Sequence, residues 1–229
     1  MRTRDSAVKQ AFPAALPVMA GYVVLGIPCG ILGTQAGMSA AQIALMSLLL
    51  YSGAGQYLIA SMWLAASPMA SIVLSVSLVN SRQTLYAAAM ARFCRRTGRR
   101  LSTLFAATLT DESFGVNLAR FTSGEPWSVR EATLVNLFAQ GAWVLANVAG
   151  AALGAVLPVP TALASFAMTS IFICLLCIQR FDRPARAAAL SAAAGVCLCK
   201  LLGWTGPAIL AGALLGIVAS LLTRGGEVS

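Results

Sequence analysis

The chain has 229 residues, of which 59% are hydrophobic and only 10% are charged, and its mean hydropathy is +0.81. Because so few polar groups could not cover the surface of a water-soluble domain, the composition excludes a water-soluble domain. It predicts an integral membrane protein. The net charge of +9 does not indicate nucleic-acid binding, because the basic residues cluster at the ends of apolar segments, where they fix membrane topology.

Uncharged stretches set the number of membrane crossings. Residues 10–81, 132–179 and 201–223 contain no charged side chain, and a spanning helix needs only about 20 residues. The sequence therefore predicts an all-α polytopic membrane protein with a single membrane domain over residues 1–229.

The first half contains a basic N-terminus at 1–10 and apolar segments at 13–33, 42–66 and 68–91. Three simple crossings would place the basic loop 92–100 outside the cell, against the positive-inside rule. We therefore expect 42–66 to enter and leave on one side, and we expect both 1–10 and 92–100 to be cytoplasmic.

The motif YSGAGQ, Tyr51 to Gln56, stands in the middle of segment 42–66. Its two glycines are expected to form a hinge between two short helices. Backbone left unpaired by such a break is tolerated at membrane depth only where protein or a water-filled cavity surrounds it. The motif therefore indicates a cavity.

The second half begins with residues 101–119, which we expect to be another partly inserted element. The remaining predicted crossings are 131–157, 159–179, 186–202 and 206–223. The total is about six full transmembrane helices plus two broken or re-entrant segments, with both termini cytoplasmic. A basic stretch followed by an interrupted segment in each half is typical of internal pseudo-repeats in transporters, although no residue-level repeat accompanies it.

Pairs of glycines four residues apart predict close helix packing. These pairs are Gly26/Gly30, Gly150/Gly154 and Gly212/Gly216.

Neither a metal site nor a cofactor site is expected. The chain has six cysteines, some in CxxC and CxC spacings, but it has no histidine. Because most of these cysteines lie in apolar segments, we interpret them as small packing residues.

Three polar islands interrupt the apolar pattern, and they are YSGAGQ with Ser47, NSRQTLY (Asn80 to Tyr86) and LTDESFGVN (Leu109 to Asn117). Arg82 in the second island is either an interfacial anchor or a functional group. The accompanying Asn80, Gln83 and Thr84 favour function, because an anchor would not need them.

Asp111 and Glu112 in the third island are the acidic residues best placed for membrane depth. A carboxyl group in a low-dielectric cavity holds its proton more tightly than in water, so this pair is the chain's best candidate for proton coupling. The alternative is a surface helix whose acids balance the nearby arginines.

Taken in order, SGAGQ, NSRQTLY and TDESF resemble the AzlC family, mainly over residues 10–120. That resemblance implies the large subunit of a bacterial inner-membrane exporter of branched-chain amino acids, acting with a small AzlD-like membrane subunit. The family commonly has histidine after the arginine of its Asn-x-Arg motif, whereas this chain has Gln83. Proton coupling would then fall to Asp111 or Glu112.

A zwitterionic amino acid needs partners for its carboxylate and its ammonium group. We expect Arg82 or the backbone N–H groups at Gly53 and Gly55 to receive the carboxylate, and Asp111 or Glu112 to receive the ammonium. The full set of predicted substrate-binding residues is Gln56, Gly53, Gly55, Asn80, Arg82 and Tyr86, and the substrate side chain is expected near Leu58, Met62 and Trp63.

Three functional classes compete. The favoured one is a proton-coupled secondary exporter of hydrophobic amino acids, and the second is a non-transporting scaffold or accessory subunit of a transport complex. An intramembrane enzyme is disfavoured, because the sequence has no Ser/His dyad, no HExxH motif and no metal-ligand set.

Overall fold

The computed structural model describes residues 4–157, 182–203 and 208–225, together with positions 160, 166, 169, 170, 173 and 177. Within these residues every regular element is helical, as the composition predicted. The helices are α1 (Arg4–Gln35), α2 (Ala40–Leu49), α3 (Gly53–Leu64), α4 (Met69–Met90), the short 3₁₀ helix η1 (Ala91–Phe93), α5 (Arg99–Ala107), α6 (Asp111–Thr122), α7 (Val129–Val156), α9 (Arg183–Leu201) and α10 (Ala208–Gly225).

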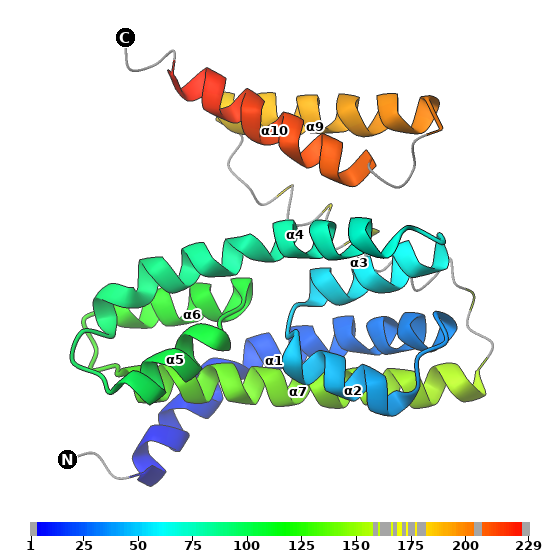
Figure 1. Cartoon of the computed structure of the whole chain (residues 1–229). Helices are drawn as coiled ribbons and strands as arrows, with labels where there is room; N and C mark the ends of the chain where they lie inside the picture. Colours follow the sequence, from blue (N-terminus) through cyan, green and yellow to red (C-terminus); the bar gives the residue numbers. More distant parts are fainter. Residues whose placement is uncertain are drawn as a thin grey trace.

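The core of the fold is the pair of long helices α1 and α7, which lie against each other along much of their length (Figure 1). Glycine makes this close approach possible. A Cβ atom on Gly30 would collide with the backbone of Asn147, and one on Gly150 would collide with the backbone of Ile27. The predicted packing role of Gly26/Gly30 and Gly150/Gly154 is therefore confirmed.

The first broken segment is a re-entrant hairpin. In Figure 1, α2 runs from the end of α1 back to the middle of the molecule, and α3 returns to the end from which α2 came. The break lies at residues 50–52, which include the first two residues of YSGAGQ and directly precede Gly53. Tyr51 makes the turn with a positive φ of 39°, and Gly53 is already the first residue of α3.

The hinge role expected for Gly53 and Gly55 is therefore wrong, and the structure gives these glycines a different task. A Cβ atom on Gly53 would stand 3.1 Å from the ring of Trp143, and one on Gly55 would stand 3.2 Å from the side-chain nitrogen of Asn80. The glycines let neighbouring side chains approach the start of α3 closely.

The second broken segment comes from the opposite end. Helix α5 runs toward the middle, the chain turns at residues 108–110, and α6 runs back between α4 and α7 (Figure 1). No glycine marks this turn. The tips of the two hairpins meet near the centre of the molecule, so that both α3 and α6 begin there.

The N-terminal end of α1 and the junction of α4 with α5 lie at the same end of the molecule (Figure 1). The basic segments 4–10 and 92–100 therefore lie at one end of the molecule, as a re-entrant α2–α3 hairpin requires. By length and composition, α1, α7 and α9 can each span a membrane. Helix α4, with 22 residues, is long enough, but the NSRQTLY island lowers its hydropathy.

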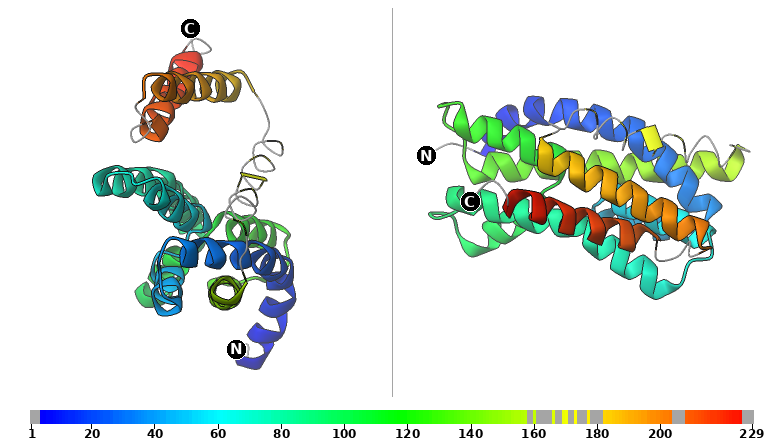
Figure 2. Two further views of the ribbon diagram at one scale, coloured as in Figure 1. Left: turned by 90° about the vertical axis from the view of Figure 1, so that its right-hand side faces the viewer. Right: turned by 90° about the horizontal axis from the view of Figure 1, so that it is seen from above.

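Helices α9 and α10 form an antiparallel pair that lies side by side in both views of Figure 2. Here too glycine sets the contact, because Gly212 faces Val196 and Ala192, and Gly216 faces Ala188. Helix α10 also touches α4. Most of the predicted crossing at 159–179 lies outside the described residues.

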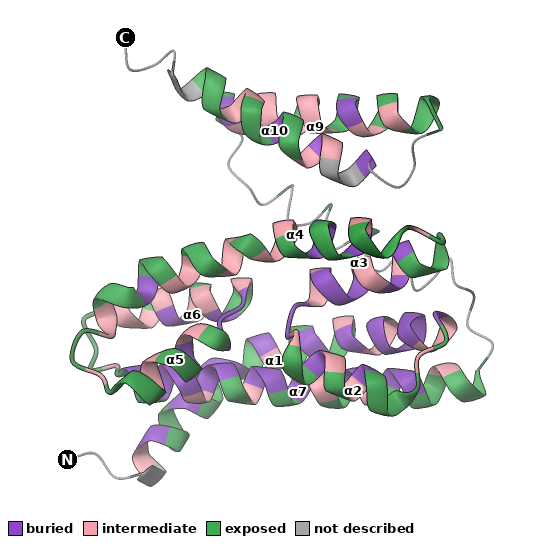
Figure 3. Cartoon of the chain, viewed as in Figure 1, coloured by how far each residue is buried: buried purple, intermediate pink, exposed green. Residues whose placement is uncertain are grey.

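Buried residues concentrate on α1, α7 and the hairpin tips, whereas many outward positions are exposed (Figure 3). Several of the exposed side chains are large and apolar, among them Val24, Leu85 and Leu145, which are exposed by 69%, 69% and 72%. Such a surface suits contact with lipid and gives the polytopic membrane fold its outer face.

Candidate functional site

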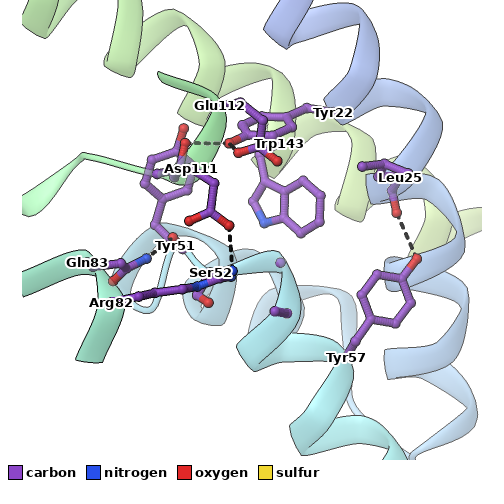
Figure 4. A pocket seen from close by; sticks show the side chains of 13 residues that line it. Tyr22, Leu25, Tyr51, Ser52, Tyr57, Arg82, Gln83, Asp111, Glu112 and Trp143 are labelled. Atoms are coloured by element: carbon purple, nitrogen blue, oxygen red, sulfur yellow. Dashed lines mark hydrogen bonds and ion pairs between the residues drawn. The ribbon is translucent and has the colours of Figure 1, made fainter. Parts of the chain in front are cut away.

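The hairpin tips border a cavity with an empty volume of about 620 Å³, including its open mouth. Both half-helix N-termini reach it, and α1, α4 and α7 complete its walls (Figure 4). Its lining residues are Tyr22, Leu25, Tyr51, Ser52, Gly53, Ala54, Tyr57, Arg82, Gln83, Thr110, Asp111, Glu112 and Trp143.

The first break is held by α4. The Ser52 hydroxyl caps α3 by accepting the N–H of Gly55, and it donates to Oδ1 of Asn80 over 2.6 Å. One turn further along α4, Nε2 of Gln83 donates to the carbonyl of Tyr51 over 3.4 Å. Two residues of the NSRQTLY island thus form hydrogen bonds with polar groups at the helix break, where intrahelical partners are missing.

The second break is held by α1. Thr110 caps α6 in a capping box with Ser113. The hydroxyl of Tyr22 lies 2.6 Å from Oγ1 of Thr110 and donates to Oε2 of Glu112 over 2.7 Å. Because Tyr22 binds both the cap and an acidic residue, it fixes the start of α6 against α1.

Helix α7 supports the other half of each hairpin. Nε2 of Gln140 donates to the carbonyl of Leu48 near the end of α2, and Nδ2 of Asn136 donates to the carbonyl of Phe105 near the end of α5. Helix C-termini leave carbonyl groups without intrahelical partners. Two amides four residues apart on α7 therefore bind to the ends of two helices that enter from opposite sides.

A charge pair crosses the cavity wall. Nη1 of Arg82 on α4 lies 2.6 Å from Oδ2 of Asp111 at the start of α6, and both side chains are partly exposed, by 33% and 22%. Arg82 thus has an ion-pair partner on the second hairpin. Beside it, the rings of Tyr86 and Phe114 stack with centroids 4.7 Å apart.

The two half-helix N-termini differ in charge. The first turn of α6 contains Asp111 and Glu112, whereas the first turn of α3 contains no acidic residue. The N-terminal end of a helix carries partial positive charge and N–H groups without intrahelical partners. The cavity therefore has a positive side, formed by Gly53, Ala54 and Arg82, that faces an acidic side.

Of the predicted site residues, Gly53, Arg82, Asp111 and Glu112 line the cavity. The other four predicted residues do not line the cavity and lie behind its surface; they are Gln56, Gly55, Asn80 and Tyr86. Each of them contacts a lining residue or stands next to a residue that contacts one. Gln56 is fully buried.

The predicted apolar contacts of the substrate lie elsewhere. Met62 packs with Ile72 and Val76 away from the cavity, with Leu58 beside them, and Trp63 is 51% exposed. Because α3 turns these side chains away from the cavity, they do not form its apolar wall.

The sequence analysis missed the residues that α1 and α7 contribute. Tyr22, Leu25 and Trp143 line the cavity, but aromatic and aliphatic residues in an apolar run carry no signal that separates a cavity wall from ordinary packing. Asn136, Gln140 and Asn147 are buried on one face of α7, and their spacing of four and seven residues was a signal that could have been read.

The described residues contain no group of three or more histidine, cysteine or acidic side chains that could hold a metal. Cys29 is buried and its thiol donates to Oε1 of Gln56, and Cys197 and Cys199 are not joined to each other.

Comparison with known proteins identifies the family. The family model described as "AzlC protein" matches residues 17–157. The "Branched-chain amino acid transport protein AzlC" of Bacillus subtilis is 29% identical over 223 residues, which cover 94% of this chain and 84% of that protein.

Two further relatives are similar over most of their length. The "Inner membrane protein YgaZ" of Escherichia coli is 28% identical, covering 91% of this chain and 87% of that protein. An "Uncharacterized membrane protein" of Helicobacter pylori is 32% identical, covering 74% of each chain. No solved structure matches significantly. The match of the family model over more than half of the sequence establishes that the chain belongs to the AzlC family.

Proposed function

We propose that this chain is a secondary transporter that exports branched-chain or similar hydrophobic amino acids across the bacterial inner membrane in exchange for protons. The observation that carries the proposal is the cavity between the two half-helix N-termini. It combines a positive side, an acidic side and an apolar end.

The charged sides match the two charges of an amino acid. The substrate carboxylate is bound by Arg82 and by the N–H groups of Gly53 and Ala54, because a helix N-terminus without acidic residues attracts anions. The substrate ammonium is bound by Asp111 or Glu112. Gly55, Asn80 and Tyr86 support these contacts from behind.

The apolar end matches an aliphatic side chain. Leu25 and Tyr57 lie away from Arg82 and Asp111 in Figure 4, and Trp143 lies between them and Asp111. Burial of an aliphatic side chain contributes about 1.5 to 3 kcal/mol, so this end favours hydrophobic over polar amino acids.

Proton exchange follows from competition for one carboxylate. A carboxylate of Asp111 or Glu112 that binds a proton loses its attraction for the ammonium group, so a proton taken up from outside releases the substrate there. Asp111 also pairs with Arg82, so that each of these two charges compensates the other.

The membrane orientation and the partner complete the proposal. The clusters of basic residues place both termini and the loop 92–100 in the cytoplasm. A small AzlD-like membrane subunit acts with this chain, as the resemblance to AzlC implies.

Uptake of radiolabelled leucine into inverted membrane vesicles tests the proposal, with and without the small subunit. We expect accumulation that disappears when the proton gradient is collapsed. Correctly inserted protein that accumulates no apolar amino acid, even with the small subunit present, would instead favour the scaffold.

A further inference from the structure

The apolar end of the cavity has a distinct lining. It is formed by one residue from each of three helices, Leu25 of α1, Tyr57 of α3 and Trp143 of α7 (Figure 4). The hydroxyl of Tyr57 donates to the carbonyl of Leu25 over 2.9 Å, which ties α3 to α1. A side chain that enters this end would therefore contact these residues.

The indole of Trp143 is held in one position. Only 3% of the residue is exposed, and the ring of Tyr22 packs against it edge to face with centroids 5.3 Å apart. Its Nε1–H donates to Oε1 of Gln56 over 3.3 Å.

Gln56 acts on the cavity only through other side chains. It does not line the cavity, and its Oε1 also accepts the thiol of Cys29 and the hydroxyl of Ser47. Because an indole N–H can only donate, the oxygen of the Gln56 amide must face Trp143. The amide at the end of YSGAGQ thus sets the position of the indole.

Gly53 also contacts the indole, about one turn before Gln56 on the same helix. A Cβ atom there would stand 3.1 Å from Cη2 of Trp143 and 3.4 Å from Cζ2. This is closer than ordinary van der Waals contact, so an alanine would push the ring away from α3. Because the ring of Tyr22 packs against the indole, the displaced indole would have to move within the space of the cavity.

We propose that Trp143, seated on Gly53 and positioned by Gln56, sets the length of the amino-acid side chain that the cavity accepts. This inference rests on the proposed transport function. Trp143 contacts the substrate side chain, Gln56 is a positioning residue, and Gly53 fixes how deep the apolar end is.

The test is the Michaelis constant for alanine, valine, leucine and phenylalanine in inverted vesicles that contain the chain and its small subunit. Gly53→Ala should raise the Michaelis constant of leucine relative to alanine by about tenfold, because one methylene in a hydrophobic pocket changes selectivity by that order. Trp143→Phe should lower the Michaelis constant of phenylalanine relative to that of leucine by about the same factor, because the smaller ring leaves more space.

Gln56→Met removes the acceptor and keeps the side-chain length. It should shift selectivity in the same direction as Trp143→Phe, and the double variant should match Trp143→Phe alone because both changes act through one ring. The control is Gly141→Ala on an exposed face of α7, where an added Cβ has no neighbour within 4 Å. This control should leave the ratios between the Michaelis constants of the four amino acids unchanged.

The outcomes separate the two proposals. If the wild-type protein transports amino acids but Gly53→Ala and Trp143→Phe do not change its selectivity, the size-limiting role of Trp143 is overturned. The transport function would then remain in place. Additive effects of Gln56→Met and Trp143→Phe would remove the positioning role of Gln56. Wild-type protein that transports no amino acid would overturn the transport function itself.

Discussion

Arg82 and Asp111 join the two halves of the site, with Nη1 and Oδ2 2.6 Å apart. Arg82 stands on α4, next to residues that hold the first hairpin, and Asp111 opens the second half of the other hairpin. The pair therefore couples two segments that enter the molecule from opposite ends. A ligand or proton that breaks this pair changes the contact between the hairpins.

Arg82→Ala, Asp111→Asn and Glu112→Gln should each abolish proton-driven leucine export while the protein still inserts. Each change removes one charge that the substrate or the proton requires. Stability should fall by only about 1 to 2 kcal/mol for the first two, because the side chains of the pair are partly exposed. The measurements are vesicle uptake and the quantity of protein in the membrane.

The matched control for the charge pair is Glu125→Gln, which removes a partner of Arg120 from an ion pair with an N–O distance of 3.1 Å far from the cavity. Arg120 lies in the last turn of α6 and Glu125 in the loop before α7, and the change should be tolerated because their side chains are 42% and 68% exposed. Normal export by all three cavity variants would rule out the proposed site.

Tyr22→Phe should slow export by about tenfold, because it removes one hydroxyl that binds both Thr110 and Glu112. The loss of a hydrogen bond to a charged group corresponds to about 1.5 to 3 kcal/mol. Export rate and thermal unfolding of the purified protein are the measurements. If Tyr22→Phe exports at the wild-type rate, Glu112 does not need Tyr22 to hold it.

The sequence predicted the architecture well because charge and hydropathy act along the chain. Basic clusters at 1–10 and 92–100 required an even number of crossings between them, and the re-entrant α2–α3 hairpin satisfies that requirement. The second hairpin was only expected as a partly inserted element. Its turn at 108–110 contains no glycine, and its cap residue Thr110 is recognisable only once the start of α6 is known.

The site was only partly predictable, because its walls come from distant segments. The polar islands indicated Arg82, Asp111 and Glu112, since charged residues are costly at membrane depth. Tyr22 and Trp143 meet these groups only after α1 and α7 pack together. Gln56 was expected to bind substrate, but the helical period of α3 turns it toward Trp143 and away from the cavity.

Gly150→Ala should lower the unfolding temperature, because the added Cβ would collide with the carbonyl of Ile27. Overpacking of a tight contact costs about 1 to 3 kcal/mol. Gly141→Ala on the same helix provides the comparison, since alanine is the better helix former and nothing obstructs its Cβ. Equal unfolding temperatures for the two variants would contradict the close packing of α1 and α7.

The re-entrant path of the first hairpin predicts which positions share a membrane face. In a variant without native cysteines, Ala41→Cys at the start of α2 and Ala65→Cys at the end of α3 should react with a membrane-impermeant maleimide from the same side. Both positions are exposed and flank the two helices of the hairpin.

Gly98→Cys, in the exposed basic loop before α5, should react only from the opposite side. Intact cells and inverted vesicles expose the two faces separately, so each cysteine can be assigned to one of them. Opposite sidedness of Ala41→Cys and Ala65→Cys would mean that 42–66 crosses the membrane. The N-terminus of α3 could then no longer meet that of α6 at the end of a hairpin, and the carboxylate site proposed at Gly53 and Ala54 would lose its structural basis.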